Sequence, residues 1–248
     1  MASKKIDYVI FDMDGLLIDT ESVYTKVTDD ILAPYGKTLT WDVKAGCMGR
    51  VEREAAAHIL RSYPGVPLTV DAYIEQRRVQ QDILWSTVRL LPGVRKLVTH
   101  LRKHNVPIAV ATASLRRNYE RKTRHLADLF DCFEGKVICG DDVKDQTTGK
   151  PEPYIFLHAA QTKLGKDVGY GEVENASPSE NEVRSKGLVF EDAVLGVQAG
   201  KRAGMNVVWV PDPGLLNLEY SGFLFPDQTI ASIEEFKPEE WGLPPYDT

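Results

Sequence analysis

The strongest constraint on the fold is a short apolar run near the start of the chain that ends directly at two acids. Residues 8–19 read YVIFDMDGLLID, so Asp12 and Asp14 follow the run and Gly15 stands directly behind them. Apolar residues without polar alternation are typical of a strand that is buried on both faces, as in a parallel sheet. The run therefore predicts a buried strand at residues 6–11 whose carboxyl end carries two carboxylates.

Four other short apolar runs extend this pattern to a whole sheet. They lie at residues 106–113, 136–142, 187–192 and 204–212. Helical patterns lie between the runs, at residues 93–104, 153–165 and 193–204. Strands that alternate with helices indicate βαβ units. We therefore expect an α/β fold with a Rossmann-like parallel sheet that helices cover on both sides.

Residues 20–90 interrupt the alternation. They contain three helical patterns, at 21–36, 51–63 and 70–85, and no strong strand run. Pro92 and Gly93 then mark the return to the main pattern. We expect an α/β core at residues 1–20 and 90–248, with a small helical-bundle cap inserted at residues 21–89.

Composition excludes several classes of protein. The 248 residues are 43% apolar and carry a net charge of −6, which argues against a general nucleic-acid binder. The basic stretch 116–124 is expected to be a solvated helix face, and the polar stretch 165–187 an exposed loop. Three cysteines without CxxC spacing favour a reducing compartment, and no segment approaches the ~18 apolar residues of a membrane span. We expect a cytoplasmic monomer that binds neither nucleic acid nor membranes.

Polar residues gather at the predicted strand ends. In an open parallel sheet, ligands bind outside the carboxyl ends of the strands. Besides the two aspartates, this edge would hold Thr112, Ala113 and Ser114, then Glu191 and Asp192, with Lys150 at the start of a helix. Crowded carboxylates repel one another unless a cation neutralises them, and Mg²⁺ prefers oxygen ligands. The pattern predicts a magnesium site beside a phosphate site.

Four segments occur in an order that resembles a known family. FDMDGLLIDTE, the TAS that follows an apolar run, GKPEPYIF and VFEDAVLGVQAGKRAGM together resemble the four motifs of the haloacid dehalogenase-like phosphohydrolases. The resemblance covers nearly the whole chain, and within the family it is closest to pseudouridine-5′-phosphatase-type proteins. Its DxD form is similar to the phosphatase and phosphomutase branches.

The resemblance implies a role for each site residue. Asp12 would be the nucleophile that forms an aspartyl-phosphate, and Asp14 the general acid and base. Mg²⁺ would be held by Asp12, the Asp14 carbonyl and Asp192, with Glu191 acting directly or through water. Thr112, Ala113 and Lys150 would bind the phosphoryl group. In the cap, Arg50 is a candidate for binding a substrate anion or hydroxyl.

Three functions are compatible with these residues. The first is a Mg²⁺-dependent phosphatase acting on a small phosphorylated metabolite, such as a nucleoside or sugar phosphate. The second is a sugar phosphomutase, in which the aspartyl-phosphate returns its phosphoryl group to the sugar. The third is a non-catalytic binding module on the same fold. Such modules usually lose the nucleophile or the metal acids, whereas Asp12, Asp14, Lys150 and Asp192 are all present here.

Overall fold

The chain divides into two compact units. The computed structural model describes all residues except 1–4, 48–51, 144–148, 216–219 and 248. One unit, the core unit, is Met1–Ile18 with Leu90–Thr248, and the other, the helical unit, is Asp19–Arg89. The chain passes from one unit to the other after Ile18 and again after Arg89. The division into a phosphatase core and a cap stays a prediction.

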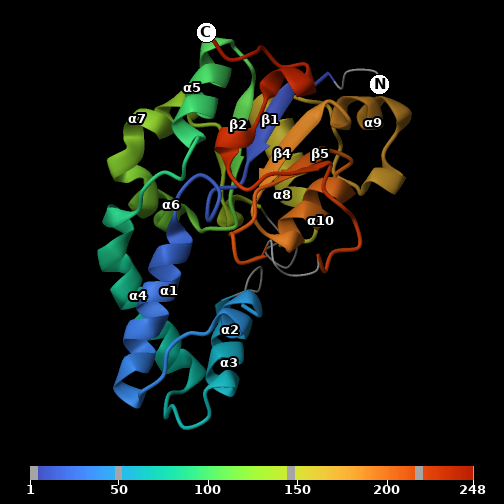
Figure 1. Ribbon diagram of the computed structural model, residues 1–248. Coiled ribbons are helices and arrows are strands. Elements are labelled where there is room, and N and C mark those ends of the chain that lie inside the picture. Colours follow the sequence, from blue (N-terminus) through green and yellow to red (C-terminus); the bar gives the residue numbers. More distant parts are fainter. Residues whose placement is uncertain (1–4, 48–51, 144–148, 216–219, 248) are drawn as a thin grey trace. The chain divides into compact units, whose positions relative to one another are not determined.

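The core unit is built on a six-stranded sheet in which every pair of neighbouring strands is parallel (Figure 1). The strand order is β3-β2-β1-β4-β5-β6, so β1 lies between β2 and β4. The strands are β1 Tyr8–Phe11, β2 Ile108–Ala111, β3 Val137–Ile138, β4 Gly187–Glu191, β5 Asn206–Trp209 and β6 Gln228–Thr229. The predicted α/β fold is confirmed. Strand β6 was not predicted, because its two polar residues carry no strand pattern.

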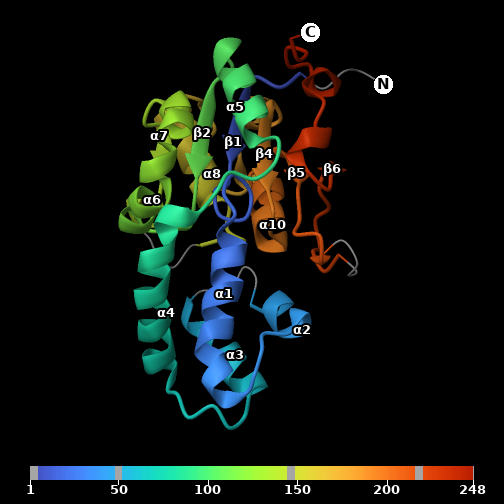
Figure 2. The same ribbon diagram turned by 60° about the vertical axis from the view of Figure 1, so that its left-hand side comes forward.

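Helices cover both faces of the sheet (Figure 2). They are α5 Val94–Lys103, α6 Arg116–Thr123, α7 Ala127–Phe130, α8 Tyr154–His158, α9 Pro178–Arg184 and α10 Val194–Arg202. Alternate side chains of β1 face opposite layers, as the pleat requires. Tyr8 and Ile10 lie in one buried apolar cluster with Phe156 of α8. Phe11 packs instead on Phe190 of β4, with ring centroids 5.0 Å apart. Both faces of β1 are therefore buried, as its apolar sequence requires.

The helical unit contains α1 Thr20–Leu32, α2 Trp41–Ala45, α3 Glu52–Ser62 and α4 Val70–Leu84. Side-chain caps fix where its two long helices begin. The Asp19 carboxylate accepts the Ser22 N–H at 3.0 Å, and the Thr69 hydroxyl accepts the Ala72 N–H at 3.1 Å. Helices α1 and α4 run side by side in both views (Figures 1 and 2). The three helical patterns read from the sequence thus correspond to α1, α3 and α4.

The expectation that residues 165–187 form an exposed loop is wrong in part. The stretch contains helix α9, which begins with a capping box between Ser177 and Glu180 and has Pro178 in its first turn. Its last residue, Arg184, is fully buried. The Arg184 guanidinium donates to the carbonyls of Val168 and Gly171, at 2.6 Å and 2.8 Å. A polar composition therefore conceals a helix that is tied to the core through a buried cation.

Among the described residues, no helix is long and apolar enough to cross a bilayer.

Candidate active site

The loop after β1 places two carboxylates at the middle of the sheet edge. The Asp12 N–H donates to the Phe190 carbonyl at 3.0 Å, which keeps Asp12 in line with the neighbouring strand β4. Asp12 is 5% exposed. The chain then turns through Gly15, whose φ of +78° favours glycine. The Met13 carbonyl accepts the N–H of Leu17 at 2.9 Å, so the turn is compact.

Lys150 joins this loop to the end of β4. Its ammonium group donates to Asp12 Oδ1 and to Glu191 Oε1. The other oxygen of Glu191, Oε2, accepts the N–H groups of Asp192 and Ala193, at 3.0 Å and 3.1 Å. Both Glu191 oxygens are therefore bonded to protein groups, and this carboxylate orients Lys150. The family resemblance implies that Glu191 also acts on the metal, directly or through water, and that role stays a prediction.

Burial and neighbouring charges shift the pKa values of both Asp12 and Lys150. Burial, supplemented by the charges of Glu191 and Asp14, raises the pKa of the Asp12 carboxyl to about 7, although Lys150 opposes the shift. Burial alone would lower the pKa of Lys150, but the Asp12 and Glu191 carboxylates outweigh it and raise that pKa above its usual value. Lys150 therefore stays charged, and Asp12 lies where a further cation would favour its ionised form.

Asp14 belongs to a second set of contacts. Its Oδ2 accepts the Ser114 hydroxyl at 2.7 Å and the Thr112 hydroxyl at 3.3 Å. Its Oδ1 accepts the ammonium of Lys122 at 2.6 Å. Thr112 and Ser114 follow β2, and Lys122 is on α6. Three elements of the core unit therefore meet at one carboxylate.

Lys122 corrects the interpretation of residues 116–124 as a solvated helix face. The exposed residues of this stretch agree with that interpretation, but Lys122 is 1% exposed. A basic composition does not reveal which residue of a helix faces inward. Helical phase is the signal that could have found it, because Tyr119, Lys122 and Thr123 share one side of α6. Ser114 was expected at the strand edge as part of the TAS triplet, but its bond to Asp14 was not predicted.

Ala113, Asp192 and Arg50 are the remaining predicted site residues. Ala113 follows Thr112, and its carbonyl lies so close to Gly140 that a Cβ there would come within 2.5 Å of the oxygen. Asp192 is buried beside Glu191, and its carbonyl accepts the Trp209 indole N–H at 2.7 Å. Arg50 lies outside the described residues. The structure thus brings together Asp12, Asp14, Thr112, Lys150 and Glu191 through contacts, with Ala113 and Asp192 adjacent in the chain.

The donor set at this edge fits a hard divalent cation. Six charged side chains have just been described at this edge, of which four are carboxylates and two are ammonium groups. The carboxylates are those of Asp12, Asp14, Glu191 and Asp192, and the ammonium groups those of Lys122 and Lys150. Asp12 and Asp192 follow two neighbouring strands that pair in register, with Phe11 opposite Phe190. Both offer carboxylate oxygens in a largely buried setting. Oxygen donors and excess negative charge are what Mg²⁺ requires.

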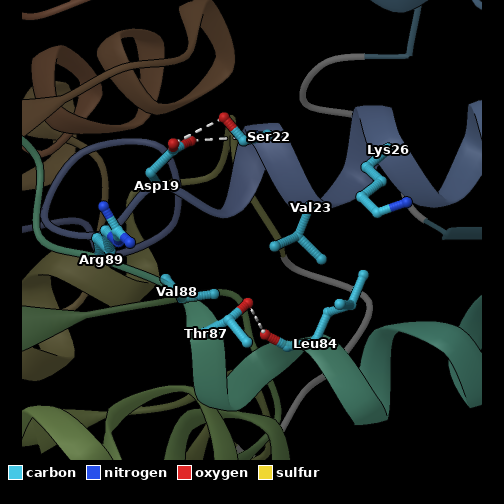
Figure 3. Close-up of a pocket in the computed structure, with 8 residues that line it drawn as sticks. All are labelled: Asp19, Ser22, Val23, Lys26, Leu84, Thr87, Val88 and Arg89. Atoms are coloured by element: carbon cyan, nitrogen blue, oxygen red, sulfur yellow. Dashed lines mark hydrogen bonds between the residues drawn. The ribbon is translucent and has the colours of Figure 1, made fainter.

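A separate hollow of about 250 Å³ lies within the helical unit. Its lining combines the start of α1 with the end of α4 and the residues after it (Figure 3). The residues are Asp19, Ser22, Val23, Lys26, Leu84, Thr87, Val88 and Arg89. It includes none of the four carboxylates at the strand ends of the core unit. Within this lining, Ser22 donates its N–H and its hydroxyl to the Asp19 carboxylate (Figure 3). The hollow is therefore distinct from the cluster of carboxylates at the sheet edge.

A family model for haloacid dehalogenase-like hydrolases matches residues 6–204. The chain belongs to this family. The (DL)-glycerol-3-phosphatase 2 of Arabidopsis thaliana is 43% identical over 244 residues, which cover 98% of this chain and 93% of that protein. A Drosophila melanogaster protein named a probable pseudouridine-5′-phosphatase is 39% identical, with 98% and 96% covered. The predicted family and its hydrolase class are confirmed.

A solved structure extends the comparison to the fold of this haloacid dehalogenase-like hydrolase. The β-phosphoglucomutase of Clostridium difficile superposes with a TM-score of 0.67 at 21% identity, over 95% of this chain and 97% of that one. At this identity the likeness shows a shared fold.

Proposed function

We propose that the protein is a Mg²⁺-dependent phosphatase that hydrolyses a small phosphomonoester through an aspartyl-phosphate on Asp12. The observation that carries the proposal is the bridge from Asp12 through Lys150 to Glu191, with Asp14 two residues further along the same loop. A buried carboxylate held by a charged lysine is a positioned nucleophile. The names of the relatives from Arabidopsis and Drosophila support a phosphate ester as the substrate.

In the first half of the reaction, a carboxylate oxygen of Asp12 attacks phosphorus and the bond to the leaving oxygen breaks. Asp14 gives that oxygen a proton, so the product leaves as an alcohol. In the second half, Asp14 takes a proton from the water that attacks the aspartyl-phosphate. Inorganic phosphate is released and the Asp12 carboxylate is restored. One side chain serves both halves because the proton moves in opposite directions.

The other residues bind and orient. Lys150 would hold Asp12 in place and bind a phosphoryl oxygen, while the Thr112 hydroxyl and the Ala113 N–H would hold others. Asp12, the Asp14 carbonyl and Asp192 would ligate Mg²⁺. The bound cation would screen the repulsion between an anionic nucleophile and an anionic phosphate. Glu191, with both oxygens bonded to protein groups, would act by orienting Lys150.

We also propose that the helical unit is a cap that selects the leaving group. It is inserted between the loop that carries Asp12 and the rest of the core unit. Two chain segments connect the units, and they are hydrogen-bonded to each other, with Leu91 N–H to Leu17 O at 3.1 Å and Asp19 N–H to Arg89 O at 2.9 Å. A paired connection of this kind is suited to bending as one element. Arg50 stays a candidate for substrate binding within the cap.

Phosphate release tests the proposal. Wild-type protein with Mg²⁺ is assayed on p-nitrophenyl phosphate, glycerol 3-phosphate and pseudouridine 5′-phosphate, alongside Asp12→Asn. We expect release by the wild type, with one of the two metabolites preferred, and none by the variant. Full activity of Asp12→Asn would exclude Asp12 as the nucleophile.

A sugar phosphomutase is the second candidate, favoured by the fold shared with the β-phosphoglucomutase of Clostridium difficile. Incubation with a hexose 1-phosphate separates the two. Free phosphate indicates the phosphatase, whereas isomerised sugar phosphate indicates the mutase.

We propose the cytoplasm as the location, because Cys47, Cys132 and Cys139 are all free thiols. The monomeric state stays a prediction.

A further inference from the structure

A buried lysine on α6 is bonded to the carboxylate that the proposed mechanism uses as acid and base. Lys122 Nζ lies 2.6 Å from Asp14 Oδ1 and 3.0 Å from Ser114 Oγ. The side chain is 1% exposed, while that of Asp14 is 21% exposed. The ammonium is therefore enclosed by protein, and Asp14 lies between it and the surface of the site.

Burial of an ammonium is unfavourable unless charged or polar groups compensate it. A lysine whose only task was to fill space would be better replaced by methionine or leucine. Here the ammonium lies 2.6 Å from Asp14 Oδ1, so a carboxylate compensates its charge. The same contact removes freedom from Asp14, because a charge-assisted bond is stronger than a bond between neutral groups.

The two oxygens of Asp14 are held differently. Oδ1 accepts the Lys122 ammonium, whereas Oδ2 accepts the hydroxyls of Ser114 and Thr112. A hydroxyl can rotate and exchange its role between donor and acceptor. The ammonium has donors alone. Oδ2 is therefore the oxygen that can gain and lose a proton once its hydroxyl partners turn, while Oδ1 stays anchored.

Ser114 links the two sides of this arrangement. Its hydroxyl lies within hydrogen-bond distance of both Lys122 Nζ and Asp14 Oδ2. Its carbonyl accepts the Gly140 N–H at 2.9 Å, and its own N–H donates to Thr112 Oγ1 at 3.0 Å. These backbone bonds fix Ser114 on the loop after β2. Its hydroxyl therefore holds Lys122 and Asp14 in a fixed position relative to each other.

We propose that Lys122 is a positioning residue for Asp14: it anchors Oδ1 so that Oδ2 is aimed at the leaving oxygen and then at the attacking water. The inference rests on the proposed phosphatase function and deepens it. Lys122 acts through Asp14 and makes no contact with the substrate. Its loss should therefore impair proton transfer while leaving phosphate binding by Lys150 and Thr112 intact.

The test varies how strongly the leaving group needs a proton. Lys122→Met keeps the apolar stem and removes the charge. It is compared with Arg121→Met, the exposed neighbour on the same helix. kcat/KM is measured for aryl phosphates of increasing leaving-group basicity and for glycerol 3-phosphate. A nitrophenolate leaves without help, whereas an alkoxide needs the acid.

General acid–base catalysis contributes about 10²–10⁴-fold. We expect Lys122→Met to lower kcat/KM for glycerol 3-phosphate by at least about tenfold, which is less than the full contribution because Asp14 itself remains. For p-nitrophenyl phosphate we expect a loss of about threefold or less, with KM little changed. Arg121→Met should match the wild type throughout. An equal loss on all esters, or an unchanged dependence on leaving-group basicity, would overturn the proposal.

Ser114→Ala covers the case in which Lys122→Met does not fold, because it removes the shared hydroxyl without deleting a charge. It should shift the dependence on leaving-group basicity in the same direction by a smaller factor. An unshifted dependence in folded Ser114→Ala would count against the proposal.

Absence of phosphate release by the wild type from every ester would instead refute the proposed function. The positioning role is then decided by crystal structures of the wild type and Lys122→Met. A reoriented Asp14 carboxylate in the variant supports it, and an unmoved carboxylate refutes it.

Discussion

Gly196 leaves open the space that the Glu191 carboxylate occupies. A Cβ built at residue 196 would lie 1.9 Å from the carboxyl carbon of Glu191 and 1.9 Å from its Oε1. Gly196 is in the first turn of α10, directly after the strand end that carries Glu191. The glycine thus allows this helix to begin against the carboxylate that orients Lys150.

Replacement of Gly196 by alanine should therefore lower kcat. Alanine is favoured over glycine in a helix by about 1 kcal/mol, so propensity alone predicts a more stable protein. The clash with Glu191 predicts the opposite, together with displacement of the Lys150 ammonium. We expect kcat for phosphate release to fall by about tenfold or more, the effect of losing roughly 1.4 kcal/mol of transition-state stabilisation.

Gly200→Ala is the matched control for that change. Gly200 lies on the same helix, α10, but faces the apolar core. A Cβ at residue 200 would come within 2.7 Å of the Val207 side chain on β5. It should lower the melting temperature and leave kcat of the folded enzyme unchanged. Equal kcat values for Gly196→Ala and the wild type would show that Glu191 does not need its observed position.

The raised pKa of Asp12 predicts how stability depends on pH. The carboxyl has a pKa of about 7 in the folded protein, against 3.8 as the ordinary value. Between these values the folded state holds a proton that the unfolded state has released. The free energy of unfolding therefore falls as pH rises through this window, by up to about 1.4 kcal/mol per pH unit from this group.

Asp12→Asn removes that dependence. Thermal unfolding in EDTA from pH 4 to pH 8 gives the free energy of unfolding of both proteins. Relative to the wild type, the free energy of unfolding of the variant should rise by about 2–4 kcal/mol across the window. Above the window the difference between the two proteins should stay constant. Parallel curves over the whole range would mean that Asp12 titrates at its ordinary value in the folded protein.

Magnesium should stabilise the folded protein through the same carboxylates. A ligand at 100 times its dissociation constant adds about 2.7 kcal/mol, which for a chain of this size corresponds to roughly 5–10 °C in melting temperature. We expect this rise for the wild type when Mg²⁺ replaces EDTA. Asp192→Asn should abolish most of it, while Asp167→Asn, at an exposed position, should keep it. A full rise in Asp192→Asn would remove Asp192 from the proposed metal ligands.

The strand ends were predictable because two independent signals coincide there. An apolar run such as residues 8–11 indicates a buried strand, and the acids that follow it have no place in a core. Because the strands are parallel, the residues that follow them, Asp12, Thr112 and Glu191, lie at one edge of the sheet. The apolar runs are enough to predict that parallel arrangement. The same logic fails for β6, which is defined by its pairing with β5 and not by its own residues.

Lys122 shows the limit of composition as a guide. Four arginines within residues 116–124 predict a solvated helix, and three of them, Arg117, Arg121 and Arg124, are exposed. The one inward lysine is determined by helical phase relative to Asp14, a residue 108 positions earlier in the chain. Residues 165–187 do carry a local signal for their helix, since Ser177 and Glu180 have the spacing of a capping box, but their polar composition hides it.

Arg184 anchors α9 to the core unit, and its removal should destabilise the protein without changing the chemistry. Its guanidinium is fully buried and donates to the carbonyls of Val168 and Gly171. Arg184→Met keeps much of the volume but deprives both carbonyls of these donors. Each buried polar group left unsatisfied costs about 1–3 kcal/mol, so we expect a loss of about 2–4 kcal/mol in the free energy of unfolding.

Lys186→Met provides the comparison, because Lys186 is exposed and pairs with Glu182 on the surface at 2.9 Å. Exposed pairs of this kind contribute little to stability, so the melting temperature of Lys186→Met should stay close to that of the wild type. Thermal unfolding followed by circular dichroism measures both variants, and kcat on p-nitrophenyl phosphate is measured well below the melting temperature. Since the hydrogen bonds of Arg184 go to Val168 and Gly171, which are not among the proposed site residues, kcat should be unchanged in Arg184→Met. A variant as stable as Lys186→Met would show that apolar packing alone holds α9 to the sheet.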